Sequence, residues 1–437
     1  MAGRPLSGDV ELGLGGGNKT VMAAQDKDDI NPAAPVPPGD DLTAEPSGLI
    51  SADEYEQAHG EKLAQTLDLS TWNPGSDLDE IYARLEREVA EAVQKEGEYQ
   101  QRVRDQIFPL LRSRPGAPRG AGVYRCSLER LEEVHKKVLF NGAAEACDGT
   151  VVSHDTLPLT ITQIGVCLVS YRGDQGSWVH RLYRRDLRAS SKRDPIEETM
   201  ELLERRRARA AVDQRSARDR LSDMARRGVM AYAERAVLLD RSNAIWRIGH
   251  GNPTPYELVT GSGMVELVRA SLALMKRLVL EHRRFVFVPS STNARELLTI
   301  GNALQPLEYA LIDTQQEGLR RIASGHYRGD AWEGVADQVN EFVEECGPNI
   351  VIGMYRASRL APAQMFYSHI DHSHEAALVV MADSVLQEHR GFPMLIDLAD
   401  SVCRASFGGE TFSVSAQVAY AQAGEPFRYA SERSTRS

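Results

Sequence analysis

The stretch CDGTVVSHDTLPLTITQIGVCLVSYRGDQGSWVHRLY, residues 147–183, decides the fold class. Parts of it are rich in β-branched residues and partly alternate between apolar and polar residues, which predicts the strands of a meander. These parts are Val151-Val152 and residues 159–171 and 178–183. Gly173 and Gly176 punctuate the meander. Strands followed by helices that alternate with strands are typical of an α/β or α+β domain.

The rest of the chain supplies that alternation. Strands are expected at residues 285–288, 350–355, 365–369 and 376–381, and helices at 128–140, 195–240, 267–280, 385–390 and 395–407. No internal repeat is visible in the sequence. We therefore expect one α/β domain over residues 121–437.

Two segments precede this domain. Residues 1–50 combine unpaired acids with a Pro-rich run and few apolar residues, which predicts a disordered acidic tail. Residues 51–120 are expected to form a helical arm and a linker, because apolar residues recur at helical spacing from Leu78 to Val93 and again at Val103 and Ile107. The apolar face of this arm could pack on its own domain, or it could serve oligomerisation or partner docking.

The composition restricts the class of protein. The formal net charge is −11, from 51 Lys and Arg against 62 Asp and Glu, and taken alone it argues against a basic coating for nucleic acid. No stretch approaches about 18 uncharged apolar residues, so no transmembrane helix is expected. Residues 1–20 lack the apolar run of a secretory signal. The five cysteines are scattered without a Cys-x-x-Cys pair, which favours neither a disulfide framework nor a zinc ribbon. We therefore expect a cytoplasmic protein that does not contact membranes.

Several acidic residues and one histidine stand where a site could form. Asp148 precedes a glycine at the start of the first strand and could face a metal ion there, although Asp-Gly is also common in turns. Glu234 lies on a helix beside apolar neighbours, where it could be a ligand or a solvated side chain. His250 ends a short strand before a loop rich in Gly and Pro, where it could be functional or structural. Asp397 and Asp400 lie on one helix, and the helix dipole alone would explain acids near its N-terminus.

A separate set of metal-ligand types lies in the segment from His369 to Glu375, which reads HIDHSHE. Histidine and carboxylate side chains at this spacing could bind a metal ion. The segment also stands between two apolar, strand-like runs, which would make it the polar tip of a hairpin. The sequence leaves both interpretations open.

The order of these short motifs resembles that of the NurA nucleases over about residues 120–437. Asp148 matches the family's first metal-binding aspartate, and Glu234 matches its helical glutamate. His250-Gly-Asn-Pro stands where the family has Asp-Gly-Pro-Leu, Gly391-Phe-Pro stands for Gly-Tyr-Pro, and Ala399-Asp400 stands for Ala-His. The family's strand that ends in a lysine corresponds to residues 285–292, which contain no lysine. One family Asp is thus His here and the family His is Asp, which keeps the number of ligands.

This resemblance implies an RNase H-like mixed sheet flanked by helices and the cleavage of DNA with Mn²⁺, or Mg²⁺. It implies that Asp148, Glu234, His250 and Asp400 hold the metal ion and are the catalytic residues. Carboxylates that hold divalent ions can neutralise charge on a phosphate and activate water, so the chemistry is suitable. The resemblance also implies a homodimer and a HerA-type hexameric ATPase as partner, in DNA end processing or anti-phage defence. This chain has no Walker A motif, so ATP-driven movement would have to come from such a partner.

Arginine is concentrated between residues 181 and 227 in spite of the negative total charge. Guanidinium groups bind phosphate through paired hydrogen bonds, so this bias favours contacts with DNA. We expect these contacts from Arg205, Arg206, Arg209, Arg226 and Arg227. The interspersed acids allow the alternative of a solvated helix with ion pairs between residues four apart.

Three functions are compatible with these patterns. The first is a divergent NurA-like, metal-dependent DNA nuclease. The second is a catalytically inactive descendant that keeps the fold as an adaptor for DNA and the ATPase, because the family's lysine and tyrosine are missing. The third is an unrelated metallohydrolase that uses the segment from His369 to His374.

Overall fold

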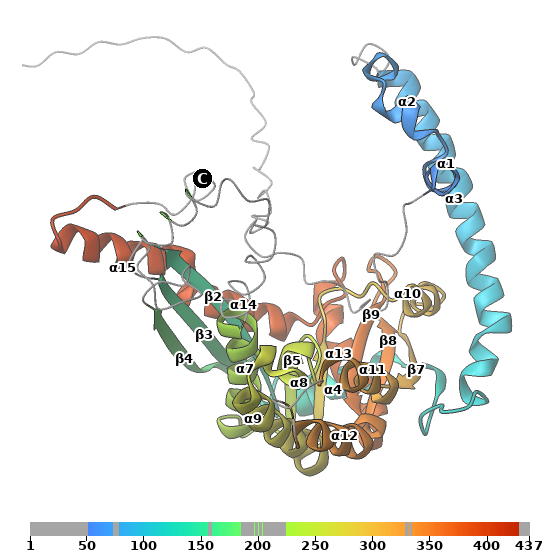
Figure 1. Ribbon diagram of the computed structural model, residues 1–437. Coiled ribbons are helices and arrows are strands. Elements are labelled where there is room, and N and C mark those ends of the chain that lie inside the picture. Colours follow the sequence, from blue (N-terminus) through green and yellow to red (C-terminus); the bar gives the residue numbers. More distant parts are fainter. Residues whose placement is uncertain are drawn as a thin grey trace, which may run out of the picture.

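The computed structural model describes residues 51–72, 78–155, 160–184, 224–327 and 334–427, together with residues 196, 200, 203 and 332. A nine-stranded mixed sheet with helices on both faces forms the body of this part of the chain (Figure 1). The prediction of an α/β fold with a mixed sheet flanked by helices is therefore confirmed. The expected tail, residues 1–50, and Arg205, Arg206 and Arg209 lie outside the described residues.

The strand order is β1-β7-β8-β9-β6-β5-β2-β3-β4. The strands are β1 (Gly122–Arg125), β2 (Ala144–Asp155), β3 (Thr160–Ser170), β4 (Gly173–Arg184), β5 (Trp246–His250), β6 (Phe285–Val288), β7 (Glu308–Thr314), β8 (Ile350–Arg356) and β9 (Gln364–His369). β2, β3 and β4 form the predicted meander and are antiparallel, whereas β5 and β6 run parallel to β2 on its other side. An antiparallel meander whose first strand is joined by two parallel strands is the arrangement of RNase H-like folds. β9, β8, β7 and β1 extend this sheet beyond β6 with antiparallel pairing.

The helices are α1 (Ala52–His59), α2 (Leu63–Leu67), α3 (Leu78–Gln106), α4 (Leu128–Val134), α7 (Val229–Asp240), α8 (Tyr256–Val259), α9 (Val265–Lys276), α10 (Arg295–Asn302), α11 (Gln316–His326), α12 (Val335–Cys346), α13 (Ser373–Ser384), α14 (Met394–Phe407) and α15 (Gly409–Gln422). The described part of the molecule has two apolar cores, one on each face of the sheet. One core contains residues of α7, α9, α11 and α12, and the other contains residues of α4, α13 and α14. Successive residues of β6 alternate between them, since Phe285 and Phe287 enter the first core and Val286 and Val288 the second.

Three local predictions were wrong. The expected strand at residues 376–381 is the middle of α13, which is buried on nearly all sides. An apolar run without polar interruption does not distinguish a buried helix from a buried strand. Asp148 and Gly149 lie inside β2 opposite Cys167 and Val166, so the turn interpretation is wrong. The segment from His369 to Glu375 joins β9 to α13 and is not a hairpin tip.

Two helix predictions are confirmed only in part. Of the helix expected over residues 195–240, the structure describes one π-helical turn, Met224–Gly228, and α7. The segment at 385–390 contains a single 3₁₀ turn, Val385–Gln387. The five cysteines are free and buried. Within the described ranges, no helix has both the length and the apolar character needed to cross a membrane.

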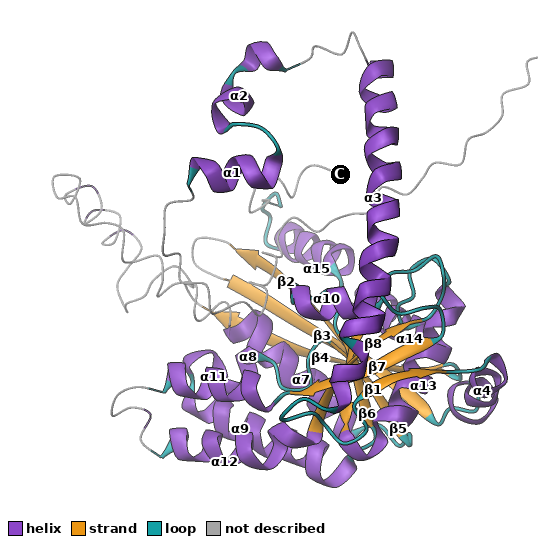
Figure 2. Cartoon of the chain, turned by 90° about the vertical axis from the view of Figure 1, so that its right-hand side faces the viewer, coloured by secondary structure: helices purple, strands orange, loops and turns teal. Residues whose placement is uncertain are grey.

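The helical arm stands away from the sheet (Figures 1 and 2). Leu85, Val89 and Val93 of α3 are 51%, 51% and 61% exposed, so this part of the helix does not pack on its own domain. The C-terminal end of α3 is anchored, because Arg104 donates two hydrogen bonds to the buried carboxylate of Glu308 at 2.7 and 3.2 Å. The arm is therefore a long helix fixed at one end.

Candidate functional site

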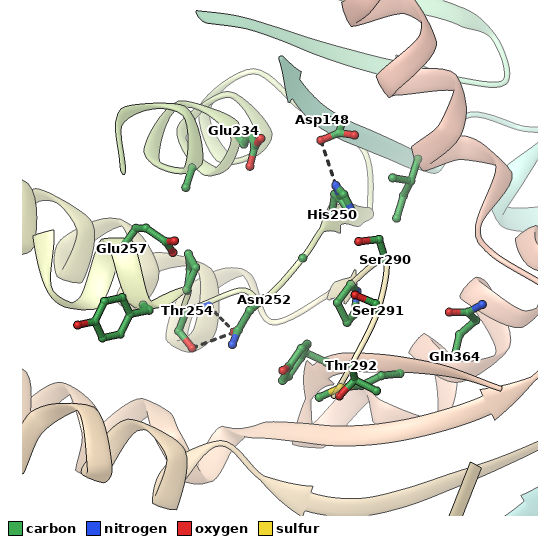
Figure 3. A pocket seen from close by; sticks show the side chains of 18 of the residues that line it. Asp148, Glu234, His250, Asn252, Thr254, Glu257, Ser290, Ser291, Thr292 and Gln364 are labelled. Carbon is green, nitrogen blue, oxygen red and sulfur yellow. Dashed lines mark hydrogen bonds and ion pairs between the residues drawn. The ribbon is translucent and has the colours of Figure 1, made fainter. Parts of the chain in front are cut away.

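The candidate site lies where β5 ends beside β2. β2 and β5 pair in parallel from Ala144 opposite Trp246 to Cys147 opposite Gly249. The next residues, Asp148 and His250, are consequently neighbours. His250 Nδ1 lies 3.4 Å from Asp148 Oδ1 (Figure 3). The carboxyl ends of parallel strands are the usual position for ligand sites in α/β sheets.

Glu234 lies on α7 and interacts electrostatically with Asp148. The helix packs against β2 on the face to which Gly149 points. The absence of a side chain at Gly149 makes this approach possible, since a Cβ there would lie 2.6 Å from Glu234 Oε1. Strand residues alternate between faces, so the residue after Asp148 is the one that faces α7. The Asp-Gly pair therefore has a structural reason in this strand: the first residue supplies a carboxylate and the second makes room for another.

Asp400 enters the same region from α14, which packs against β2 and β3. Its carboxylate accepts a hydrogen bond from Arg404 at 2.8 Å and interacts electrostatically with Asp148 and His250. Asp148, Glu234, His250 and Asp400 thus line one groove, so the structure brings the four predicted residues together. Asp397 also lines the groove, but its carboxylate binds Arg390 at 2.5 Å.

The groups in this cluster shift one another's charge states. Burial, assisted by the nearby Asp148 carboxylate, raises the pKa of Glu234 to about 7. Burial also raises the pKa of Asp400, and Asp148 again adds to the effect. Burial opposes the protonation of His250, but Asp148 and Glu234 outweigh it and raise the pKa of His250 to about 9. These directions favour the protonated imidazole of His250 beside Asp148 and make the ionised form of Glu234 harder to reach than that of an exposed glutamate.

Each carboxylate of the cluster is paired with a cation. Asp148 pairs with His250, Glu234 pairs with Arg235 at 3.2 Å, and Asp400 pairs with Arg404. In the part of the chain that the structure describes, no group of three or more His, Cys, Asp or Glu side chains is arranged to hold a metal ion. The donor types nevertheless suit Mn²⁺ or Mg²⁺, and a bound cation would offset the burial of these carboxylates and their repulsion by Asp148, which together raise the pKa of Glu234 and of Asp400.

The cluster opens into a groove of about 3290 Å³. Hydroxyl side chains follow β6 along one wall, at Ser290, Ser291 and Thr292 (Figure 3). The amide side chain of Asn293 also lines the groove. Arg226 and Arg227 also line the groove, with Arg227 3.9 Å from Glu257. Side chains of these types commonly contact phosphate groups. Two of the five arginines predicted to bind DNA thus line the same groove as the cluster.

The alternative metal cluster is not formed. His369 is buried and its Nδ1 accepts a hydrogen bond from the backbone N–H of Asp371 at 3.1 Å. His372 instead faces Glu375, and His374 bonds Tyr309 at 3.0 Å. The three histidines therefore have different partners, so an unrelated metallohydrolase that uses this segment is not supported.

Two features of the site were not predicted from the sequence. The first is Arg235, a buried arginine next to Glu234. The second is the polar run at residues 290–293, which follows the buried strand β6 after Pro289. A polar run that follows an apolar strand is a signal that could have identified the second feature. The burial of Arg235 has no counterpart in the sequence, because arginine is usually exposed.

No known protein-family profile matches the sequence, and no curated protein matches it significantly. Among solved structures, the NurA nuclease from Sulfolobus solfataricus aligns with 74% of this chain and 91% of its own, at 8% identity and a TM-score of 0.38. A NurA structure bound to dAMP and manganese aligns with 73% and 92%, at 8% identity and a TM-score of 0.35. Endonuclease V from Ciona intestinalis, in complex with DNA, aligns with 64% and 95%, at 12% identity and a TM-score of 0.25. The RNase H-like arrangement of this chain rests on its strand order and strand directions and not on these alignments.

Proposed function

We propose that this chain is a NurA-like DNA nuclease that depends on a divalent metal ion. The observation that carries the proposal is that Asp148, Glu234, His250 and Asp400 line one open groove and that Asp148 interacts electrostatically with each of the other three. These residues come from four different elements, and burial together with repulsion by Asp148 raises the pKa of Glu234 and of Asp400. Groups with such shifts in a groove are typical of functional sites.

Asp148, Glu234, His250 and Asp400 would hold Mn²⁺ or Mg²⁺. The bound ion would neutralise charge on the scissile phosphate and lower the pKa of an attacking water. His250 must lose its proton before its nitrogen can act as a ligand, and so must the protonated fraction of Glu234. The proposal therefore requires that the three ion pairs of the cluster open when the ion is bound.

The groove walls would hold the DNA. Ser290, Thr292 and Asn293 carry hydrogen-bond donors for phosphate oxygens, and Arg226 and Arg227 add positive charge. Contacts from Arg205, Arg206 and Arg209 are proposed on the arginine bias alone. These contacts make the binding dependent on salt concentration.

We further propose a cytoplasmic homodimer, a HerA-type hexameric ATPase as partner, and a role in DNA end processing or anti-phage defence. These proposals rest on the resemblance of the sequence motifs to those of the NurA nucleases. The three segments, a tail at 1–50, an arm at 51–120 and a nuclease domain at 121–437, belong to the same proposal. The exposed apolar side chains of α3 make the arm a candidate for contact with a second copy or with the ATPase.

The test is the cleavage of linear double-stranded and single-stranded DNA with Mn²⁺, with Mg²⁺ or with EDTA. Wild-type protein is compared with Asp148→Ala, Glu234→Ala and a control, His372→Ala, whose side chain lies outside the cluster. We expect metal-dependent cleavage in the wild type and the control and its loss in both cluster variants. Cleavage that survives both cluster substitutions would refute the assignment of the site.

An inactive adaptor is the second candidate. The observation that favours it is the set of three internal ion pairs, which already neutralises the cluster without a metal ion. An adaptor would bind DNA and the ATPase but would cut no DNA under any of the metal conditions. The same experiment, extended with a DNA-binding measurement, therefore separates the two functions.

A further inference from the structure

Arg235 is a buried arginine whose guanidinium group binds almost only backbone. Its side chain is 3% exposed. Nε donates to the carbonyl of Pro253 at 3.1 Å, Nη1 donates to the carbonyl of Ala231 at 2.8 Å, and Nη2 donates to the carbonyl of Asn252. The group also lies over the ring of Phe287 on β6, 5.3 Å from its centroid. Arg235 therefore ties α7 to the loop that follows β5.

The same guanidinium group contacts the cluster directly. Nη1 lies 3.2 Å from Glu234 Oε2, while the other oxygen of this carboxylate lies in the space above Gly149. The loop bound by Arg235 starts immediately after His250. One side chain thus contacts both the Glu234 carboxylate and the backbone that continues from His250.

Burial of this charge has a cost that the contacts must offset. Desolvation lowers the pKa of Arg235, and Glu234 opposes that effect. A buried arginine is retained when planar, forked hydrogen bonding is needed, because lysine offers a single point charge and shorter reach. The carbonyls of Asn252 and Pro253 are adjacent acceptors that suit such a fork.

Arg247 provides an internal comparison. It lies on β5 three residues before His250, about 10 Å along the strand from it. Its Nη2 donates to the carbonyls of Ser242 and Leu239, at 3.0 and 3.4 Å, at the far end of α7. Arg235 and Arg247 thus join the same helix to segments at opposite ends of the same strand, and only Arg235 does so at the site.

We propose that Arg235 is a positioning residue that fixes both the Glu234 carboxylate and the loop 251–254 for the chemistry of the groove. The role of Arg235 in catalysis rests on the proposed function. The contacts by which Arg235 holds Glu234 and the loop do not depend on that function. Removal of Arg235 should free the loop and let the carboxylate rotate, whereas removal of Arg247 should loosen the distant end of α7 and the contact of β5 with His282, both away from the cluster.

The test compares full-length wild type with Arg235→Met, Arg235→Lys and Arg247→Met. Hydrogen–deuterium exchange is measured in peptides that cover residues 250–256, and Mn²⁺ affinity is measured by titration of the metal alone. We expect Arg235→Met to speed exchange in these peptides at least about tenfold and to weaken Mn²⁺ binding about 10- to 100-fold, as loss of a supporting contact typically does. Arg235→Lys should fall between Arg235→Met and the wild type, and it keeps the test informative if the methionine variant does not fold.

Arg247→Met is expected to lower thermal stability while exchange at residues 250–256 and Mn²⁺ affinity stay at the wild-type level. Equal effects of the two arginine substitutions on these peptides would overturn the positioning role. Unchanged exchange in folded Arg235→Met or Arg235→Lys would overturn it as well. Wild-type protein that binds neither Mn²⁺ nor Mg²⁺ would refute the proposed nuclease, and the exchange data would still decide whether Arg235 holds the loop.

Discussion

Replacing Gly149 by alanine should separate Glu234 from Asp148 while both carboxylates remain. A Cβ at this position would lie 2.6 Å from Glu234 Oε1, 3.0 Å from Met230 Cγ and 3.2 Å from Glu234 Cγ. The carboxylate oxygen must therefore move by about 0.8 Å, the difference between 2.6 Å and an ordinary contact of 3.4 Å. These three neighbours are side-chain atoms, and alanine is compatible with the extended backbone of β2. The substitution thus moves a functional group without breaking the strand.

The structural change predicts a large effect on activity and a small one on stability. A displacement of about 1 Å of a positioned group can cost on the order of 100-fold in rate. The free energy of unfolding should change by less than about 1 kcal/mol, because the lower backbone entropy of unfolded alanine offsets the local crowding. Activity and stability should therefore respond very differently to the same methyl group.

The assay combines DNA cleavage, Mn²⁺ titration and urea unfolding on Gly149→Ala, Glu234→Asp and the double variant. Aspartate is one methylene shorter than glutamate and leaves room for the new methyl group, so the double variant should bind Mn²⁺ more tightly than two independent losses would allow. Gly97→Ala is the matched control, since a Cβ there meets nothing within 4 Å. Folded Gly149→Ala with wild-type cleavage and Mn²⁺ affinity would refute the reasoning, and so would strictly additive losses in the double variant.

Two further predictions concern stability. Burial raises the pKa of Asp383 from an ordinary value of 3.8 to about 6, so its stabilising contribution is full below about pH 4 and is lost as the pH rises through 6. Asp383→Asn should therefore be more stable than the wild type by roughly 3 kcal/mol at pH 8 and nearly equal to it at pH 4, as measured by urea unfolding; a difference that does not change with pH would contradict this. Arg104→Met should lower the free energy of unfolding by about 2–4 kcal/mol, because the carboxylate of Glu308, 7% exposed, loses its partner. The double variant Arg104→Met/Glu308→Met should recover part of that loss, and no recovery would show that packing of α3, rather than charge, is responsible.

The elements of the fold that depend on local sequence could be predicted. The β-branched run at residues 159–171 and the apolar run Phe285–Val288 are strands because their side chains enter cores on the faces of the sheet. The uninterrupted apolar character of α13 misled the prediction, since burial on all sides removes the period that identifies a helix. Pairing between distant strands was not predictable, because no local pattern specifies which strands meet.

The site was predictable in its members and not in its geometry. Asp148 and His250 become neighbours through a parallel register between β2 and β5, and a slip of one residue would turn one of them to the opposite face. Glu234 approaches only because position 149 has no side chain. Neither the register of β2 and β5 nor the approach of Glu234 to Gly149 can be predicted from residue types or from short spacings in the sequence. The motifs identified candidates, and long-range strand pairing decided that they meet.

The net charge of the chain does not describe the charge of the candidate site. Three carboxylates that contribute to the total of −11 are matched within the cluster by His250, Arg235 and Arg404. The site is therefore close to neutral in the arrangement described, and a polyanion would not meet an excess of negative charge at this point of the groove. Loss of a proton from His250 and rotation of Arg235 or Arg404 would each expose a carboxylate. With the three ion pairs closed, the cluster presents a neutral surface to a polyanion. With the pairs of Asp148, Glu234 and Asp400 open, it presents a negative pocket to a cation.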